Sequence, residues 1–452
     1  MSKHDNLIQL STAPVGRLLW QYSLPAVVGM VVMSLYNIVD RIFIGQFVGP
    51  EAIAGLAITF PVMNLSAAIG VLIGAGSSSR VSIMMGADDK NGAEMVLGNS
   101  LVLSILNCCI YLTIFAVFLD EILIAFGASD ATLPYARDFM LWILPGMFLT
   151  NMAFSFNNIM RASGYPVKAM VTMFIGAGVN ILIVPVTIYW LGMGIKGAAI
   201  ATDIAMAISA VFVMKHFFNR KSTLHFIRGT FTLKWTIVAG IISIGAAPSI
   251  VNACASVINM MINKNLYAYG GDLAVGAAGI FTTFASLMTM VIIGICQGMQ
   301  PIVGYNYGAG NTARLKRAYY MAVGASSLIC ILGASFALSF PAVIARIFTT
   351  DAGLIEVTRL ALSTSMVAFW VVGFQIVSTN FFQSIGKAGK SIFLSLTRQV
   401  IFLIPLLIYF PPIFGLKGVW MAFPLSDILA TVITAIMIVW QMKQINRGAA
   451  RA

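Results

Sequence analysis

Long apolar stretches separated by short polar segments run along the whole chain. Each stretch holds about 20 residues or more and is solidly apolar, without the alternation of a β-strand. Such stretches predict helices, because in lipid every backbone polar group must find its partner within the protein. At about 1.5 Å per residue they are long enough to cross a hydrocarbon core about 30 Å thick. Twelve spans are predicted, at residues 18–44, 53–79, 95–119, 134–160, 168–190, 195–218, 236–267, 274–303, 318–341, 358–382, 391–411 and 417–442.

Composition and charge agree with a polytopic membrane protein. Of 452 residues, 59% are hydrophobic and 9% are charged, whereas about a quarter of the residues in a soluble domain are charged. The net charge of +12 does not require a nucleic-acid partner, because most of the 27 Lys and Arg fall in the termini and the even-numbered loops. Loops on the cytoplasmic side are enriched in Lys and Arg. Both termini are therefore expected on the cytoplasmic side of the inner membrane, and no obligate protein partner is evident.

The largest basic cluster lies between the sixth and seventh spans. It contains Lys215, Arg220, Lys221, Arg228 and Lys234. We interpret this segment as a cytoplasmic linker that sets the topology, with a partner-binding patch as the alternative.

A weak internal repeat divides the chain into halves. Residues 23–41 match 246–264 at an offset of 223, residues 157–170 match 379–392 at 222, and "GIKG" (194–197) matches "GLKG" (415–418) at 221. Six spans per half is an even number, so both halves enter the membrane from the same side. The expected fold is all-α, with two pseudo-symmetric six-helix bundles. The expected parts are a cytoplasmic segment (1–17), a first lobe (18–218), a basic linker (219–235), a second lobe (236–442) and a cytoplasmic tail (443–452).

The residue inventory argues against an enzyme. The three histidines are His4, His216 and His225, and none lies in the middle of a span. The spans therefore hold no His-based metal cluster or acid–base pair. No metal site and no cofactor are expected, apart from a coupling ion.

The first span places Asp40 and Arg41 side by side in "YNIVDRIFIGQ". A charge inside a membrane span is costly and marks a functional site by default. Arg41 lies near the end of its span, where its side chain can reach the interface. Successive residues of a helix point about 100° apart, so Asp40 can face the bundle interior. Asp40 is accordingly interpreted as a cation or proton site, with a purely structural network of Asp40 with Arg41 or with other polar residues as the alternative.

Other polar residues within apolar spans are candidates for the same site or for a cavity. In the first half they are Asn157 and Asn158 in the fourth span, Asn180 in the fifth, and Thr202 and Asp203 in the sixth. Their oxygen atoms suit a sodium ion or a proton relay, although each alone could serve helix packing. The candidates in the second half are Lys264, Gln297, Gln300, Gln383 and Arg398. Pro25, in the middle of the first span, permits a bend that could couple ion and substrate.

Four motifs together resemble the multidrug and toxic compound extrusion (MATE) family, and the resemblance covers essentially the whole chain. They are "SLPAVVGMVVMSLYNIVDRIFIGQ" in the first span, "RASGYP" after the fourth, "VNILIVP" in the fifth and "GAAIAT" in the sixth. The resemblance implies multidrug efflux, in which amphiphilic, often cationic compounds leave in exchange for H⁺ or Na⁺ by alternating access. By position it implies that Asp40, Asn180 and Thr202 form the ion site, and Asn157 resembles a polar residue of the fourth span.

One position departs from the family pattern. The family often has an aspartate one helical turn after the asparagine of the fifth span, and this chain has Val184 there. Asp40 is then the one carboxylate of the site unless Asp203 turns inward. A single carboxylate binds sodium less strongly and avoids like-charge repulsion, which favours protons slightly over Na⁺ at Asp40.

Two other functions compete with efflux. A lipid-linked sugar flippase of related architecture would need a strongly basic cavity, for which Lys264 and Arg398 are few. A membrane receptor or enzyme is disfavoured by the missing catalytic residues. In each case the surrounding partner is the lipid bilayer, and in the favoured case the ligand is a small amphiphile.

Overall fold

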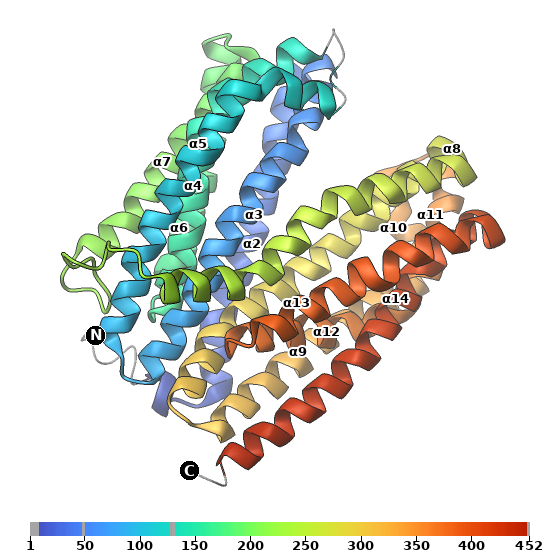
Figure 1. The fold of residues 1–452 in the computed structure, drawn as a ribbon. Coiled ribbons are helices and arrows are strands. Elements are labelled where there is room, and N and C mark those ends of the chain that lie inside the picture. Colours follow the sequence, from blue (N-terminus) through green and yellow to red (C-terminus); the bar gives the residue numbers. More distant parts are fainter. Residues whose placement is uncertain (1–8, 48–49, 127, 129–131, 450–452) are drawn as a thin grey trace. The chain divides into compact units, whose positions relative to one another are not determined.

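The computed structural model describes residues 9–47, 50–126, 128 and 132–449. It describes only the backbone at residues 37–42, 44–47, 50–57, 60, 116, 256, 448 and 449. All regular elements in this part of the chain are helical (Figure 1). They are α2 (Val15–Phe47), α3 (Pro50–Gly86), α4 (Lys90–Ala125), α5 (Leu133–Ala162), α6 (Pro166–Pro185), η1 (Val186–Trp190), α7 (Gly194–Phe218), α8 (Trp235–Gly308), α9 (Thr312–Ser339), α10 (Pro341–Phe348), α11 (Ala352–Ser365), η2 (Met366–Val371), α12 (Val372–Ser384), α13 (Ala388–Leu396), η3 (Thr397–Leu403) and α14 (Ile404–Ala449).

The helices confirm the predicted spans. Within the described residues, 10 helical runs are long and apolar enough to cross a membrane. Two of these runs contain a glycine with left-handed backbone, namely Gly271 (φ 62°) in α8 and Gly415 (φ 59°) in α14. Dividing the two runs at these glycines gives twelve spans, in the order that the hydropathy pattern predicts. The chain is an all-α multi-pass membrane protein.

The chain forms two compact units. Unit 1 comprises residues 1–13 and 28–252, and unit 2 comprises 14–27 and 253–452, as far as these ranges are described. The first part of α2 therefore packs with the second half of the sequence, and the first part of α8 packs with the first half. The lobe ranges expected from the sequence assign these two segments to the opposite unit.

Close helix packing in unit 1 depends on small residues of α3. The Ser155 hydroxyl on α5 donates to the Gly70 carbonyl at 2.9 Å, and a Cβ atom at Gly74 would lie 2.9 Å from the Ser155 Cα. Another face of α3 touches α8, where a Cβ at Gly76 would lie 2.0 Å from the Ile241 carbonyl oxygen. Glycines allow such backbone approach between membrane helices.

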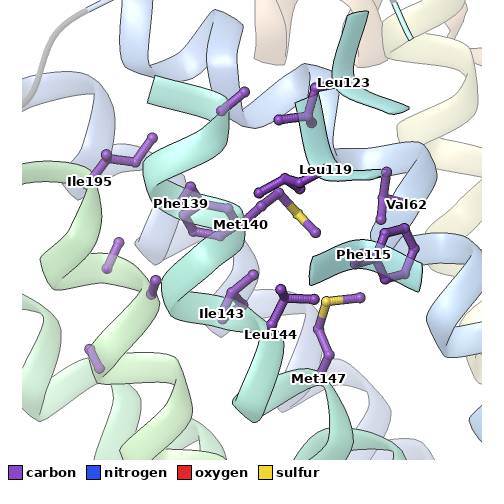
Figure 2. Packing of buried hydrophobic residues seen from close by; sticks show 14 of the residues in the cluster. Val62, Phe115, Leu119, Leu123, Phe139, Met140, Ile143, Leu144, Met147 and Ile195 are labelled. Carbon is purple, nitrogen blue, oxygen red and sulfur yellow. The ribbon is translucent and has the colours of Figure 1, made fainter. Parts of the chain in front are cut away.

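A solid apolar cluster fills part of unit 1 (Figure 2). It draws side chains from α3, α4, α5, α6, η1 and α7, so it fixes these helices relative to one another. The labelled members are Val62, Phe115, Leu119, Leu123, Phe139, Met140, Ile143, Leu144, Met147 and Ile195.

Unit 2 is organised around α9, α12 and α14. Helix α9 packs on α12 and η2, while α14 packs on η3, α11, η2 and α12. The buried Tyr319 hydroxyl of α9 is hydrogen bonded to Ser378 of α12 at 2.8 Å. The first part of α2 lies against α8, where a Cβ at Gly298 would come within 2.5 Å of the Ser23 amide nitrogen.

The backbone repeats between the halves at three turns. Asp88 (φ 59°) corresponds to Gly310 (φ 70°) at an offset of 222. At the other two turns glycines correspond to glycines: Gly164 (φ 99°) to Gly386 (φ 73°), and Gly194 (φ 58°) to Gly415 (φ 59°). The left-handed conformation favours glycine, so the two glycine pairs explain why the sequence matches at 157–170 and 194–197 include these turns.

The segment between α7 and α8 is packed onto α4 within unit 1. The buried Asn99 amide of α4 donates to the carbonyls of Thr230 and Thr232 at 3.1 Å, and its oxygen accepts from the Lys234 amide at 2.9 Å. A Cβ at Gly98 would lie 2.4 Å from the Thr230 carbonyl oxygen, so glycine is needed for this approach. The basic linker is therefore a docked element that leads directly into α8.

Candidate functional site

Asp40 lies on α2, seven residues before this helix ends at Phe47. Its side chain and that of Arg41 lie outside the described residues. The interpretation of Asp40 as a cation or proton site therefore stays a prediction.

The structure brings together two of the residues predicted to accompany Asp40. The Asn180 amide on α6 donates to the Thr202 hydroxyl on α7 at 3.0 Å. The Thr202 hydroxyl in turn donates to the Ala198 carbonyl at 3.1 Å. Asn180 is 1% exposed, and its amide oxygen accepts no hydrogen bond from a described residue. This oxygen remains an acceptor for a donor or a cation.

Asp203 turns to the other side of α7. Its Oδ1 atom is buried and accepts no hydrogen bond of ordinary geometry from a described residue. It lies against the backbone of Gly146 on α5, where a Cβ atom would be 1.7 Å from Oδ1. Because Thr202 and Asp203 are about 100° apart around the helix, one faces α6 and the other faces α5. Both lie about 12–14 Å from the start of α7, well inside the span.

Asn157 and Asn158 belong to a different cluster. Arg161, which is buried at the end of α5, donates to the Asn157 oxygen at 2.9 Å and to the Asn158 oxygen at 3.3 Å. The Asn157 amide donates to the Ala169 carbonyl on α6 at 2.6 Å. Ala169 precedes Asn180 by 11 residues on α6, or about 16 Å along the helix. The structure therefore does not place Asn157 and Asn158 beside Asn180 and Thr202, and the role of Asn157 in coupling stays a prediction.

The contacts of Arg161 were not foreseen from the sequence. Arg161 lies in the "RASGYP" motif, and its bonds to Asn157 and Asn158 hold together the last turn of α5. The spacings of three and four residues bring these side chains to one helix face, which is the signal that could have found the cluster.

Val184 occupies a fully buried position in the apolar cluster of unit 1. The fifth span therefore supplies no carboxylate at the position where the MATE family often has an aspartate. Asp203, one span later, is the described carboxylate next to Thr202.

Pro25 lies within α2, two residues before the point at which α2 leaves unit 2. A proline removes one helical hydrogen bond and crowds the preceding turn. Its neighbour Ser23 donates to the Ile295 carbonyl of α8 at 3.5 Å. The proline thus lies close to the end of the segment of α2 that packs on α8.

Among the candidates in the second half, Arg398 has an acidic partner. Its Nε atom donates to Asp427 Oδ1 of α14 at 2.6 Å. Lys264 is exposed on α8, Gln297 is half-buried, and Gln300 and Gln383 are buried. The repeat carried a signal for the aspartate but not for its arginine partner, because "SDI" (426–428) in α14 resembles "TDI" (202–204) in α7 at an offset of 224.

Comparisons with known proteins identify relatives over the whole length. The sequence profile of the MatE family matches residues 25–186 and 248–408. The two matches begin 223 residues apart and end 222 apart, which confirms the internal repeat. The chain is 24% identical over 444 residues to the multidrug export protein MepA of Staphylococcus aureus, covering 98% of this chain and 97% of MepA.

Solved structures agree with these relatives. An outward-facing multidrug resistance MATE family transporter superposes with a TM-score of 0.91 at 26% identity, covering 97% of this chain and 98% of that one. A MATE structure in the bent conformation gives 0.93 at 26% identity, covering 98% and 99%. A MOP superfamily transporter from Pyrococcus furiosus, which is described as having a binding pocket of reverse polarity, gives 0.90 at 26% identity, covering 97% and 98%.

Proposed function

This chain belongs to the MatE family, and on that premise we propose that it exports amphiphilic, often cationic organic compounds across the cytoplasmic membrane in exchange for H⁺ or Na⁺. The observation that carries the proposal is the family match in both halves of one multi-pass chain. The named relatives are multidrug export proteins and multidrug resistance transporters. Both termini lie on the cytoplasmic side in this proposal, as the distribution of Lys and Arg favours.

The coupling ion binds in unit 1 in this proposal. Asp40 supplies the charge, while Asn180 and Thr202 supply neutral oxygen atoms from α6 and α7. The Asn180–Thr202 hydrogen bond of 3.0 Å holds two of these groups in place before the ion arrives. Protons are favoured slightly over sodium, because α6 has Val184 in place of a second carboxylate. No metal cofactor or organic cofactor takes part.

Transport proceeds by alternating access. Ion binding at Asp40 changes the packing of α2 near Pro25 and disfavours the state that binds substrate. The two ligands then weaken each other's binding by the same factor, because linkage between equilibrium affinities is reciprocal. The chain passes from one unit to the other between residues 13 and 14, within α2 and within α8, and these three places are where such a change must be accommodated.

Dye transport in proteoliposomes tests the proposal. Efflux of a cationic dye is measured under an imposed pH gradient and then under a sodium gradient, for wild type and Asp40→Asn. We expect one gradient to drive efflux in wild type and neither to drive it in the variant. Thr113→Ala is a suitable control, because the Thr113 side chain is exposed on α4 and its hydroxyl bonds only to the Cys109 carbonyl of its own helix.

Two results would redirect the assignment. If neither gradient drives dye efflux in wild type, export of that dye is not the function. Translocation of a lipid-linked sugar is then the next activity to assay. If Asp40→Asn remains fully coupled, Asp40 has a structural role.

A further inference from the structure

Unit 2 contains a buried ion pair within the membrane-spanning part of the chain. Arg398 Nε and Asp427 Oδ1 are 2.6 Å apart. Asp427 is 5% exposed, whereas the Arg398 side chain is 27% exposed. The two terminal nitrogens of the Arg398 guanidinium make no hydrogen bond to a described residue. The Asp427 end of the pair is therefore buried, and the Arg398 end is partly exposed.

The pair lies deep within its spans. Arg398 follows the start of α13 at Ala388 by ten residues, about 15 Å along the helix. Asp427 follows the break at Gly415 by twelve residues, about 18 Å along α14. In a hydrocarbon core about 30 Å thick, both charges lie near the middle. Charges at this depth are rare, and they mark ion or proton pathways more often than they serve stability.

Arg398 lies on an unusual piece of helix. It is the second residue of the π-helix η3, which joins α13 to α14 (Figure 1 labels the two α-helices). A π-helix carries about one more residue per turn than an α-helix, and such segments occur frequently at functional sites. If η3 closes to α-helical geometry, Arg398 rotates about the helix axis and its guanidinium moves away from Asp427.

Few other ionisable groups face Asp427 from the elements packed on α14. Cys330 of α9 lies close enough to interact electrostatically with both members of the pair. Glu356 and Arg359 of α11 pair with each other at 3.5 Å. Lys390 of α13 donates to Gln441 toward the end of α14.

The remaining elements add little charge near Asp427. Helices η2 and α12, as described, carry no acidic or basic residue. Lys264 of α8 is exposed, and its neighbour Asn265 bonds to the Leu407 carbonyl before the break at Gly415. Lys417 lies in the first turn after that break. The charge state of Asp427 thus depends chiefly on Arg398.

We propose that the Arg398–Asp427 pair is a second proton-coupling site. The ion pair breaks and re-forms as unit 2 changes conformation. This inference rests on the proposed transport function and adds to it a second group that binds and releases a proton during transport. When Arg398 turns away, a proton from water binds the Asp427 carboxylate, since an isolated carboxylate charge is disfavoured in a low-dielectric interior. Arg398 stays protonated throughout, because arginine does not lose its proton in proteins. When the pair re-forms, Asp427 releases the proton.

A neutral double variant separates coupling from structure. Arg398→Gln with Asp427→Asn keeps a polar contact of similar shape but cannot titrate. Replacing both members of a buried ion pair is commonly neutral for stability, whereas removing one member leaves a buried charge. Ser426→Ala is the matched control, because it changes the neighbouring residue, whose hydroxyl bonds only to the Phe423 carbonyl of its own helix.

The first measurement is proton release on binding of ethidium, a cationic dye, to protein in lipid nanodiscs. We expect wild type and Ser426→Ala to release about one proton more per ethidium than the double variant, because binding linkage counts the protons that the second site gives up. Equal release from wild type and double variant would overturn the inference, as would wild type that binds ethidium without releasing any proton. Wild type that does not bind or transport cationic dyes would instead count against the proposed function.

A second measurement needs no substrate. Infrared difference spectra between low and high pH report the carbonyl stretch of protonated carboxyl groups. We expect wild type to gain a band on acidification that the double variant lacks and that Asp40→Asn retains. Identical bands in wild type and double variant would show that Asp427 does not take up a proton.

Discussion

The two halves place an aspartate from a similar local sequence in different surroundings. In α7 the residues "TDI" place Asp203 against the backbone of Gly146, and its Oδ1 accepts no hydrogen bond of ordinary geometry from a described residue. In α14 the residues "SDI" place Asp427 against Arg398 at 2.6 Å. The difference comes from the neighbouring helix and not from the aspartate or its sequence context. A carboxylate within a span therefore acquires its role from the residue that another span presents to it.

The largest expected effect comes from breaking the pair in the second half. Asp427→Ala leaves the Arg398 charge without its partner, and we expect it to lower the free energy of unfolding by about 3–5 kcal/mol. Asp203→Ala in the first half breaks no ion pair with a described residue, so we expect a change within about 1 kcal/mol. Denaturant titration in mixed micelles measures both. Equal losses from the two substitutions would mean that the carboxylates have equivalent surroundings.

The second prediction concerns the space beside Asp203. Gly146→Ala places a methyl group where the carboxylate oxygen lies, and we expect a loss of about 1–3 kcal/mol from overpacking. Gly178→Ala on α6 is the matched control, because a methyl group added there would have no atom within 4 Å, and we expect a gain of up to about 1 kcal/mol. The double variant Gly146→Ala with Asp203→Ala should recover most of the loss. No recovery would show that Asp203 does not fill this space.

A third difference lies at the ends of the repeated halves, because α7 is followed by a docked linker whereas α14 continues as a helix to Ala449. Asn99→Ala removes the hydrogen bonds to Thr230, Thr232 and Lys234, and we expect a loss of about 1–3 kcal/mol. Trypsin should then cut the basic linker faster than in wild type or in the Thr113→Ala control. An unchanged cleavage rate would mean that the linker is held without Asn99.

The smallest expected effects come from substitutions at the repeated left-handed turns. Gly310→Ala forces a residue with a Cβ atom into a left-handed conformation, with an expected loss of about 1 kcal/mol. Asp88→Gly, at the corresponding turn of the first half, should be neutral or stabilising by up to about 1 kcal/mol for the same reason. Thermal unfolding of the two variants side by side measures the difference. Destabilisation by Asp88→Gly would show that the aspartate side chain contributes to its turn.

The hydropathy pattern was sufficient to predict the twelve spans, because membrane helices are set by length and apolarity. The repeat was also predictable, since left-handed glycines such as Gly194 and Gly415 keep their place in both halves. The contacts of Asn157 and Arg398 were not predictable, because they depend on which helix face meets which neighbour. The docking of the linker was missed for another reason: its lysines and arginines suggest a solvated segment, while Asn99 and Gly98 on α4 hold it.

The repeated left-handed turns mark two copies of one layout within a single chain. Two copies with the same six-span layout insert in the same direction, as two identical subunits of a dimer would. In such a dimer, any change in one copy appears in the other. In one chain the halves are free of this constraint, and each holds a different residue beside its aspartate: Arg398 beside Asp427 and Gly146 beside Asp203. The single chain is thus what permits two kinds of carboxylate within one transporter.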